Sequence, residues 1–181
     1  MIETDRLTLR PYSLADAGRV QQMCNDWEIA STTLVLPHPY PDGAAEQWIS
    51  THAESFRQGA GAVLAITLKP DGSVIGTVPL SINKNHQRGE LGYMVAKEHW
   101  NRGYCTEACR ALMSYGFSTL GLDRIQAMHF PRNPASGRVM QKLGMTREGL
   151  LRQYVSNRGT HEDIIMYPIL RHEFGTPGKA V

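Results

Sequence analysis

The segment from Gly89 to Phe117 constrains the fold more than any other part of the chain. Its sequence, GELGYMVAKEHWNRGYCTEACRALMSYGF, predicts a strand, a tight turn that contains glycine, and a long helix. A helix N-terminus offers N–H groups without intrahelical partners and a partial positive charge, so it can bind an anion. Gly103 would let the backbone approach that anion closely, because it carries no side chain. The segment therefore predicts an anion site at the start of the helix.

The composition is that of a soluble globular protein. A length of 181 residues, with 41% hydrophobic and 20% charged residues, is typical of one domain with a sizeable core. The net charge of +2 comes without a block of lysine and arginine, which argues against nucleic-acid binding. No apolar run is long enough to span a membrane, and the charged opening MIETDRLTLR is unlike a signal peptide. Three scattered cysteines do not suggest a disulfide framework, so we expect a reduced, cytoplasmic protein that is not bound to a membrane.

The N-terminal half predicts short strands and two helices. Ser13 and Asp16 have the spacing of a capping box, and Asp42 is the expected N-cap of the second helix. The stretch 27–41 contains three prolines and is expected to be an irregular loop, either pinned to the core or covering a substrate. Pro79 cannot donate a ladder hydrogen bond, so it predicts a bulge or an edge. The expected elements are strand 7–10, helix 13–25, helix 42–56 and the hairpin strands 62–68 and 74–82.

The C-terminal half adds a strand, a short helix and a long hairpin. The order of strand, helix and strand around the segment 104–117 predicts a parallel pair with a right-handed crossover. We expect a single domain over residues 1–174 and a disordered tail over 175–181. The expected elements are strand 124–130, helix 135–143, and strands 146–155 and 162–170 joined by a turn at 157–159.

Three motifs of the chain resemble the GNAT superfamily of N-acetyltransferases, and within it the ribosomal-protein N-terminal acetyltransferases. They are TDRLTLRPYSLADA, then ELGYMV followed by HWNRGYCTEACRALMSYGF, and finally NPASGRVMQKLGMTREG. The resemblance covers nearly the whole chain, in the order that the family has. It implies a mixed α/β (α+β) fold with a mostly antiparallel twisted sheet. In that fold a central parallel strand pair splays around the coenzyme, and about four helices flank the sheet.

The resemblance implies that acetyl-CoA is the cosubstrate and that no metal takes part. The phosphate loop of the superfamily usually reads Gln/Arg-x-x-Gly-x-Gly/Ala, and here Trp100 takes its first place and Cys105 its last. The pantetheine would lie between strands 89–95 and 124–130. Asn133 matches the family's pantetheine-binding asparagine, and Arg138 is either a partner of a coenzyme phosphate or a surface residue. The remaining implied contacts are the N–H groups of Arg102, Gly103, Tyr104, Cys105 and Thr106 to the pyrophosphate, and the backbone of Met94 and Val95 to the pantetheine.

Acetyl transfer to an amine needs a base for the amine, stabilisation of an oxyanion and a proton for the departing thiolate. Glu90 is the candidate base, because alternation puts it on the same strand face as Gly92 and Met94. The competing interpretation is a salt bridge with Arg88 or with a neighbouring strand residue.

The acid is a different residue from the one usual in the superfamily. The place that often holds a tyrosine is Met140 here, and a thioether cannot protonate a thiolate. Ser136, three residues after Asn133, becomes the candidate acid, as the resemblance also suggests. Cys105 and Cys109 lie four residues apart without an evident third ligand, so we expect them to pack in the helix rather than to bind metal.

Three functions fit these observations. The first is transfer of an acetyl group to the N-terminal α-amine of a protein or peptide. An α-amine has a pKa of about 8 and is partly neutral at pH 7, whereas a lysine amine at about 10.4 is not. The second is acetylation of a small amine such as a polyamine, an aminoglycoside or an amino acid. The third is a coenzyme-binding sensor without turnover. A homodimer fits all three.

Overall fold

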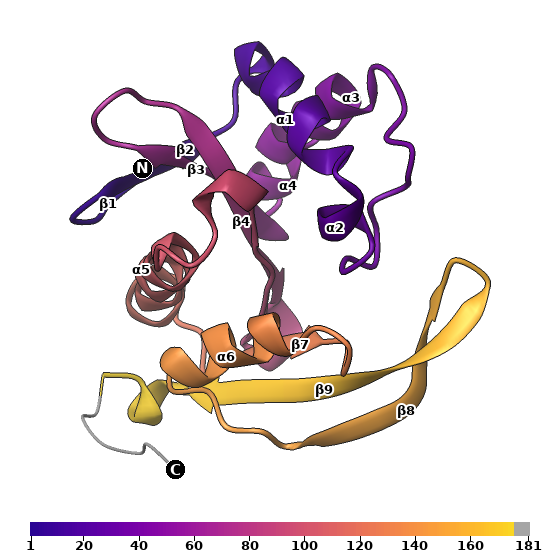
Figure 1. Ribbon diagram of the computed structural model, residues 1–181. Helices are drawn as coiled ribbons and strands as arrows, with labels where there is room; N and C mark the ends of the chain where they lie inside the picture. The colour runs from indigo at the N-terminus through magenta and orange to yellow at the C-terminus, as the bar shows by residue number, and fades with distance from the viewer. Residues whose placement is uncertain (176–181) are drawn as a thin grey trace.

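The computed structural model describes residues 1–175 and contains one mixed sheet with helices on both faces (Figure 1). Within these residues the strand order is β1-β2-β3-β4-β5-β7-β9-β8, and β6 pairs with β4. All pairs are antiparallel except β5 with β7, which is parallel, so the predicted sheet is confirmed. The strands are β1 (Ile2–Glu3), β2 (Leu7–Pro11), β3 (Gly61–Leu68), β4 (Val74–Asn83), β5 (Arg88–Leu91), β6 (Met94–Val95), β7 (Arg124–His129), β8 (Gly149–Asn157) and β9 (Thr160–Leu170).

The helices divide between the two faces of the sheet. In Figure 1, α5 lies on one side of β4, and α1, α3 and α4 lie on the other. The helices are α1 (Ala17–Cys24), α2 (Trp27–Ala30), α3 (Ala44–Ser50), α4 (His52–Arg57), α5 (Tyr104–Ser118) and α6 (Pro134–Lys142). The main core, which we call the α5 cluster, packs α5 and α6 against the sheet, and a smaller α1 cluster packs α1 and α3 against the other face. Among the described helices, none is long and apolar enough to cross a bilayer. Apart from Gly175, the predicted tail 175–181 lies outside the described residues.

Three local predictions in the N-terminal half are wrong. The stretch expected to be irregular contains α2, because the Asp26 carboxylate accepts a hydrogen bond from the Glu28 N–H and caps a helical turn. The predicted second helix is divided into α3 and α4. At the division, the N–H and the hydroxyl of Thr51 both donate to the carbonyl of Trp48, three residues back, which interrupts the regular bonding. The N-cap of α3 is Gly43 rather than Asp42.

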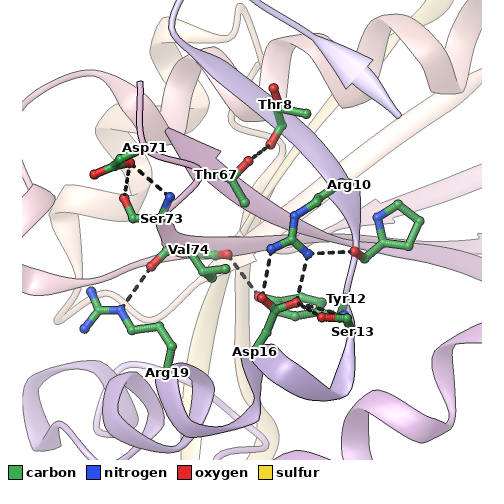
Figure 2. Close-up of polar contacts among 12 residues, drawn as sticks. Thr8, Arg10, Tyr12, Ser13, Asp16, Arg19, Thr67, Asp71, Ser73 and Val74 are labelled. Atoms are coloured by element: carbon green, nitrogen blue, oxygen red, sulfur yellow. Dashed lines mark hydrogen bonds and ion pairs between the residues drawn. The ribbon is translucent and has the colours of Figure 1, made fainter. Parts of the chain in front are cut away.

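Partly buried polar contacts attach α1 and the segment before it to the sheet (Figure 2). Arg10 donates two hydrogen bonds of 2.8 Å to the carboxylate of Asp16, which also accepts the N–H of Ser13. The hydroxyl of Tyr12 donates to the carbonyl of Gly76 on β4 at 3.0 Å. Arg19 of α1 donates to the carbonyl of Val74 at 3.0 Å. The helices on this face are therefore held to β2 and β4 by directional bonds as well as by apolar packing.

The ladder beside β4 is interrupted opposite Pro79. Leu80 pairs with Leu91 and Gly76 with Val95, a separation of four residues on each strand, so no residue is inserted and there is no bulge. The Gly92 N–H donates to the Pro79 carbonyl at 2.9 Å, but proline has no N–H to return to Gly92. The predicted irregularity at Pro79 is thus one missing bond between β4 and Gly92, at the break between β5 and β6. The register of the ladder is unchanged.

Candidate functional site

The start of α5 has the properties predicted for an anion site. Gly103 precedes the helix with a φ of +81°, a left-handed conformation that glycine adopts without strain. In the described chain no side chain caps this end, so the first-turn N–H groups of Tyr104, Cys105 and Thr106 keep their donor capacity for an external acceptor. A Cβ added to Gly103 would meet only Arg6 Nη2, at 3.4 Å. These features fit a pyrophosphate group, whose charge the helix end favours.

Arg6, which the sequence did not single out, fixes this loop from the N-terminal segment. Its Nη1 donates to the Arg102 carbonyl at 2.9 Å, and its Nε donates to the Glu107 carboxylate at 2.7 Å. Thr4 also donates to Glu107, at 2.7 Å. Burial would raise the pKa of Glu107, but these hydrogen bonds outweigh it and hold the pKa below its usual value. The carboxylate therefore stays ionised and paired, which limits its repulsion of an anion at the helix end.

A gap opens between β6 and the end of β7. The parallel pairing of β5 with β7 ends where Glu90 lies opposite Gln126. β6 begins four residues farther along, at Met94, and pairs with β4 alone. The two central strands thus diverge on the side toward α6, as predicted for strands that splay around an extended ligand.

Backbone alternation decides which groups of β6 face this gap. The Ala96 N–H donates to the Ile75 carbonyl of β4 at 2.8 Å. In an antiparallel ladder the next residue turns its backbone groups the other way, so the N–H and C=O of Val95 point away from β4, toward the gap. The Val95 carbonyl accepts the indole N–H of Trp100 at 2.6 Å. By the same alternation Met94 directs its backbone groups to β4, which leaves Val95 as the better placed of the two predicted residues.

The N-terminus of α6 forms the other wall of the gap. The Asn133 side chain accepts the N–H of Ser136 at 3.3 Å and caps the helix, and Pro134 occupies its first turn. The hydroxyl of Tyr93 lies 2.8 Å from Ser136 Oγ and 2.9 Å from the Ser136 carbonyl. Tyr93 is not predicted from the sequence, where its only signal is a phenol in the predicted strand 89–95. Met140, the place of the family's usual tyrosine, is buried in the α5 cluster.

Glu90 has a neutral partner rather than a salt bridge. Its carboxylate accepts a hydrogen bond of 3.3 Å from the amide of Gln126 on β7. Arg124 donates in turn to Gln126 at 3.3 Å and forms a bidentate pair with Glu148. The Glu90 side chain is exposed, whereas Gln126 is buried. The carboxylate is therefore oriented by an amide and open to a ligand.

Glu90 and Ser136 lie on opposite faces of the sheet. Tyr93 and Val95 pack in the α5 cluster, whereas Met94 packs in the α1 cluster. Alternation puts Glu90 on the face of Met94, and Tyr93 contacts Ser136 on the face of α5. Glu90 is the last residue of β5 that pairs with β7, so it lies at the edge of the gap on the face opposite Ser136.

The other predicted site residues take simpler positions. Arg138 is exposed on α6, near the start of that helix. Cys109 is buried in the α5 cluster, and burial raises the pKa of its thiol well above its usual value, so it is a poor nucleophile and metal ligand. Among residues 1–175 no group of three or more His, Cys, Asp and Glu side chains could hold a metal ion.

The loop 27–41 is fastened to the end of the β8–β9 hairpin. Arg158 of the hairpin turn donates to the carbonyls of Ala30 and Leu36, at 2.8 and 2.9 Å. Arg132, just after β7, donates to the Ser31 carbonyl at 2.7 Å and pairs with Glu162. Between loop and hairpin lies a pocket of about 230 Å³, whose lining is Trp27, Ser31, Arg132, Asn157, Arg158, Thr160 and Glu162. The pocket borders the end of β7 at which the gap opens.

Comparison with known proteins identifies the same architecture. Residues 6–146 match the family model described as acetyltransferase (GNAT) domain. The chain is 34% identical to the uncharacterized N-acetyltransferase YoaA of Bacillus subtilis over 172 residues, which are 94% of this chain and 97% of that protein. It is 29% identical to spermidine N(1)-acetyltransferase of Escherichia coli K12 over 116 residues, 61% of this chain and 62% of that protein. The structure of RimL, a ribosomal alpha-N-protein acetyltransferase in complex with coenzyme A, superposes with a TM-score of 0.83 at 18% identity, covering 92% of this chain and 95% of RimL.

Proposed function

The chain belongs to the GNAT acetyltransferases, and from this premise we propose that it transfers the acetyl group of acetyl-CoA to the N-terminal α-amine of a protein or peptide. One observation carries the proposal. The uncapped N-terminus of α5, the edge of β6 away from β4, and Glu90, where the pairing of β5 with β7 ends, mark out the path that we infer for the cosubstrate. A long cosubstrate with a phosphate group at one end and a thioester at the other fits that path.

Each part of the path has a role in holding acetyl-CoA. The N–H groups of residues 102–106 bind the pyrophosphate, and the exposed guanidinium groups of Arg102 and Arg138 add positive charge near the phosphates. The Val95 N–H faces the gap and donates to the pantetheine or to the thioester oxygen, where it stabilises negative charge. Asn133, which caps α6, offers its remaining amide donors to the pantetheine arm.

Two residues assist the transfer. Glu90 takes a proton from the attacking amine, directly or through a water molecule, on the open face of the sheet. The Ser136 hydroxyl, on the opposite side of the gap, donates a hydrogen bond that stabilises the departing thiolate, which takes its proton from solvent. The gap holds amine and thioester together, and this proximity supplies much of the rate.

The acceptor proposal rests on charge and on amine basicity. The names of the relatives point both ways, because one acts on spermidine and the structurally similar RimL on a protein α-amine. A polyamine needs several carboxylates, yet the pocket beside the gap has two arginines and one glutamate in its lining. That lining offers hydrogen-bond donors and acceptors suited to a peptide backbone. An α-amine, with a pKa of about 8, also needs less help from a single exposed carboxylate than a more basic amine.

One assay tests the proposal. Purified protein is incubated with acetyl-CoA and a panel of peptides with free N-termini, the same peptides with blocked N-termini and an internal lysine, and spermidine, while free thiol is measured. We expect thiol release with the free N-termini only. Turnover with spermidine but with no peptide would refute the acceptor proposal. Tight binding of acetyl-CoA without turnover on any amine would instead favour the sensor.

A further inference from the structure

The bond between Tyr93 and Ser136 crosses the gap that divides β6 from α6. Tyr93 lies in the break between β5 and β6, next to Gly92, which makes one of the two possible ladder bonds with Pro79 of β4. Its hydroxyl is within hydrogen-bond distance of two oxygens of Ser136, at 2.8 Å from Oγ and 2.9 Å from the carbonyl. These residues are 43 positions apart, so the contact exists only because the fold brings the two walls together.

The donors and acceptors that Tyr93 and Ser136 bring to this contact determine where the hydroxyl proton of Ser136 points. The phenol has one proton, which it gives either to the Ser136 carbonyl or to Ser136 Oγ. When the phenol donates to Oγ, the serine proton is left without that partner and is free to turn into the gap. A serine in the first turn of a helix otherwise satisfies its hydroxyl on nearby backbone groups. Burial raises the pKa of Tyr93 far above its usual value, so the phenol keeps its proton throughout.

We propose that Tyr93 is a positioning residue for the leaving group: it donates to Ser136 Oγ and thereby directs the Ser136 O–H at the departing sulfur of coenzyme A. The inference rests on the proposed function, because it assigns a role within the same site. Tyr93 itself neither touches the sulfur nor loses a proton. Its effect is to make Ser136 a better donor to negative charge that develops on sulfur.

The titration of bound coenzyme A tests this without any acceptor. A donor aimed at the sulfur stabilises the thiolate, so the thiol of bound coenzyme A has a lower pKa than the free thiol. The ultraviolet absorbance of the thiolate is followed against pH in the wild type, in Tyr93→Phe and in Ser136→Ala. We expect the thiol pKa to be higher by about one unit in both variants, which is a tenfold change in the ionisation constant. Equal titrations in the wild type and in Tyr93→Phe would overturn the inference.

Kinetics and a matched control variant distinguish a positioning role of Tyr93 from a purely structural one. Tyr12→Phe is the control, because it also removes a partly buried hydroxyl that donates to a backbone carbonyl, that of Gly76. We expect Tyr93→Phe to lower kcat about tenfold with less than a twofold change in the KM for acetyl-CoA, and Tyr12→Phe to lower thermal stability without lowering kcat. The double variant of Tyr93 and Ser136 is expected to be no slower than Ser136→Ala alone. Multiplied losses in the double variant, or a wild-type kcat in Tyr93→Phe, would refute the role of Tyr93.

The two proposals fail in different ways. A wild-type protein that binds no coenzyme A would refute both. A wild-type protein that binds coenzyme A, lowers the pKa of its thiol through Tyr93 and acetylates no amine would refute only the transferase proposal. A wild-type transferase that is unaffected by Tyr93→Phe would refute only the positioning role.

Discussion

The sharpest prediction concerns Gly103, because the chain contains a matched control for it. Gly103 and Gly43 both precede a helix, with φ and ψ of +81° and −2° in the first and +76° and −5° in the second, and neither helix start has a side-chain cap. A Cβ at Gly43 would meet nothing within 4 Å, and at Gly103 only the end of the Arg6 side chain. An alanine at either place therefore meets the same backbone strain in similar space.

The magnitudes follow from that strain. A left-handed conformation costs a residue other than glycine about 1–2 kcal/mol, and the smaller entropy of the unfolded alanine chain returns about 0.4–1 kcal/mol. Each substitution should therefore lower the free energy of unfolding by about 1 kcal/mol. At Gly103 the strain also turns the first N–H groups of α5 away from their ligand. Loss of one hydrogen bond to a charged group costs about 1.5–3 kcal/mol, which weakens binding by about ten- to a hundredfold.

Calorimetry and denaturant unfolding measure the two effects separately. We expect both variants to unfold at similarly reduced denaturant concentrations, and only Gly103→Ala to bind acetyl-CoA more weakly. Acetyl-pantetheine, which lacks the pyrophosphate, should bind the wild type and Gly103→Ala alike. An unchanged affinity of Gly103→Ala for acetyl-CoA, with the expected loss of stability, would refute the assignment of the phosphate loop.

Three further substitutions test other parts of the structure. Glu90→Gln keeps the partner Gln126 but should abolish the acidic limb of the kcat/KM profile; a retained limb would exclude Glu90 as the base. Trp100→Phe leaves the Val95 carbonyl without its indole donor and should raise the KM for acetyl-CoA about fivefold, since such a bond is worth about 1 kcal/mol; an unchanged KM would remove Trp100 from the site. The hydrogen bonds from Arg10 lower the pKa of Asp16, so the pair stabilises the fold above pH ~4 and this contribution is lost as the pH falls through the lowered pKa. Asp16→Asn should lower the free energy of unfolding by about 1–3 kcal/mol at pH 7, and the stability of this variant should depend less on pH in the acid range. Equal urea midpoints of the wild type and the variant at pH 7 would contradict this expectation.

Local signals in the sequence predicted the elements that surround the site. The long helix after Gly103 and the hairpin turn at residues 157–159 occur where glycine, apolar spacing and turn residues indicated, whereas the predicted strand 89–95 is divided into β5 and β6. The parallel pair of β5 and β7 follows from chain order alone, since a helix connects the two strands. These features depend on neighbouring residues or on connectivity, both of which a single sequence contains.

Contacts between distant segments could not be predicted in the same way. The competing interpretation of Glu90 is a salt bridge with Arg88 or with a neighbouring strand residue. Its partner is instead the neutral amide of Gln126, which lies opposite it because of the parallel register. Glu107 in the first turn of α5 is fixed by Thr4 and Arg6, which lie about one hundred residues away in the turn between β1 and β2. In each case the side chain type was visible in the sequence and the partner was not, because the partner depends on how strands align.

The surroundings of Ser136, the proposed donor to the leaving sulfur, also depend on a contact between distant segments. From the sequence, the absence of a tyrosine at Met140 left Ser136 as a solitary hydroxyl, and a lone serine is a weak acid. The fold brings a different phenol, that of Tyr93, to 2.8 Å from Ser136 Oγ across the gap. Tyr93 lies in the break between β5 and β6, beside Gly92, which makes only one of the two backbone bonds of a regular ladder. Pro79, which denies Gly92 one of those bonds, is thus linked to the same site as Tyr93 and Ser136.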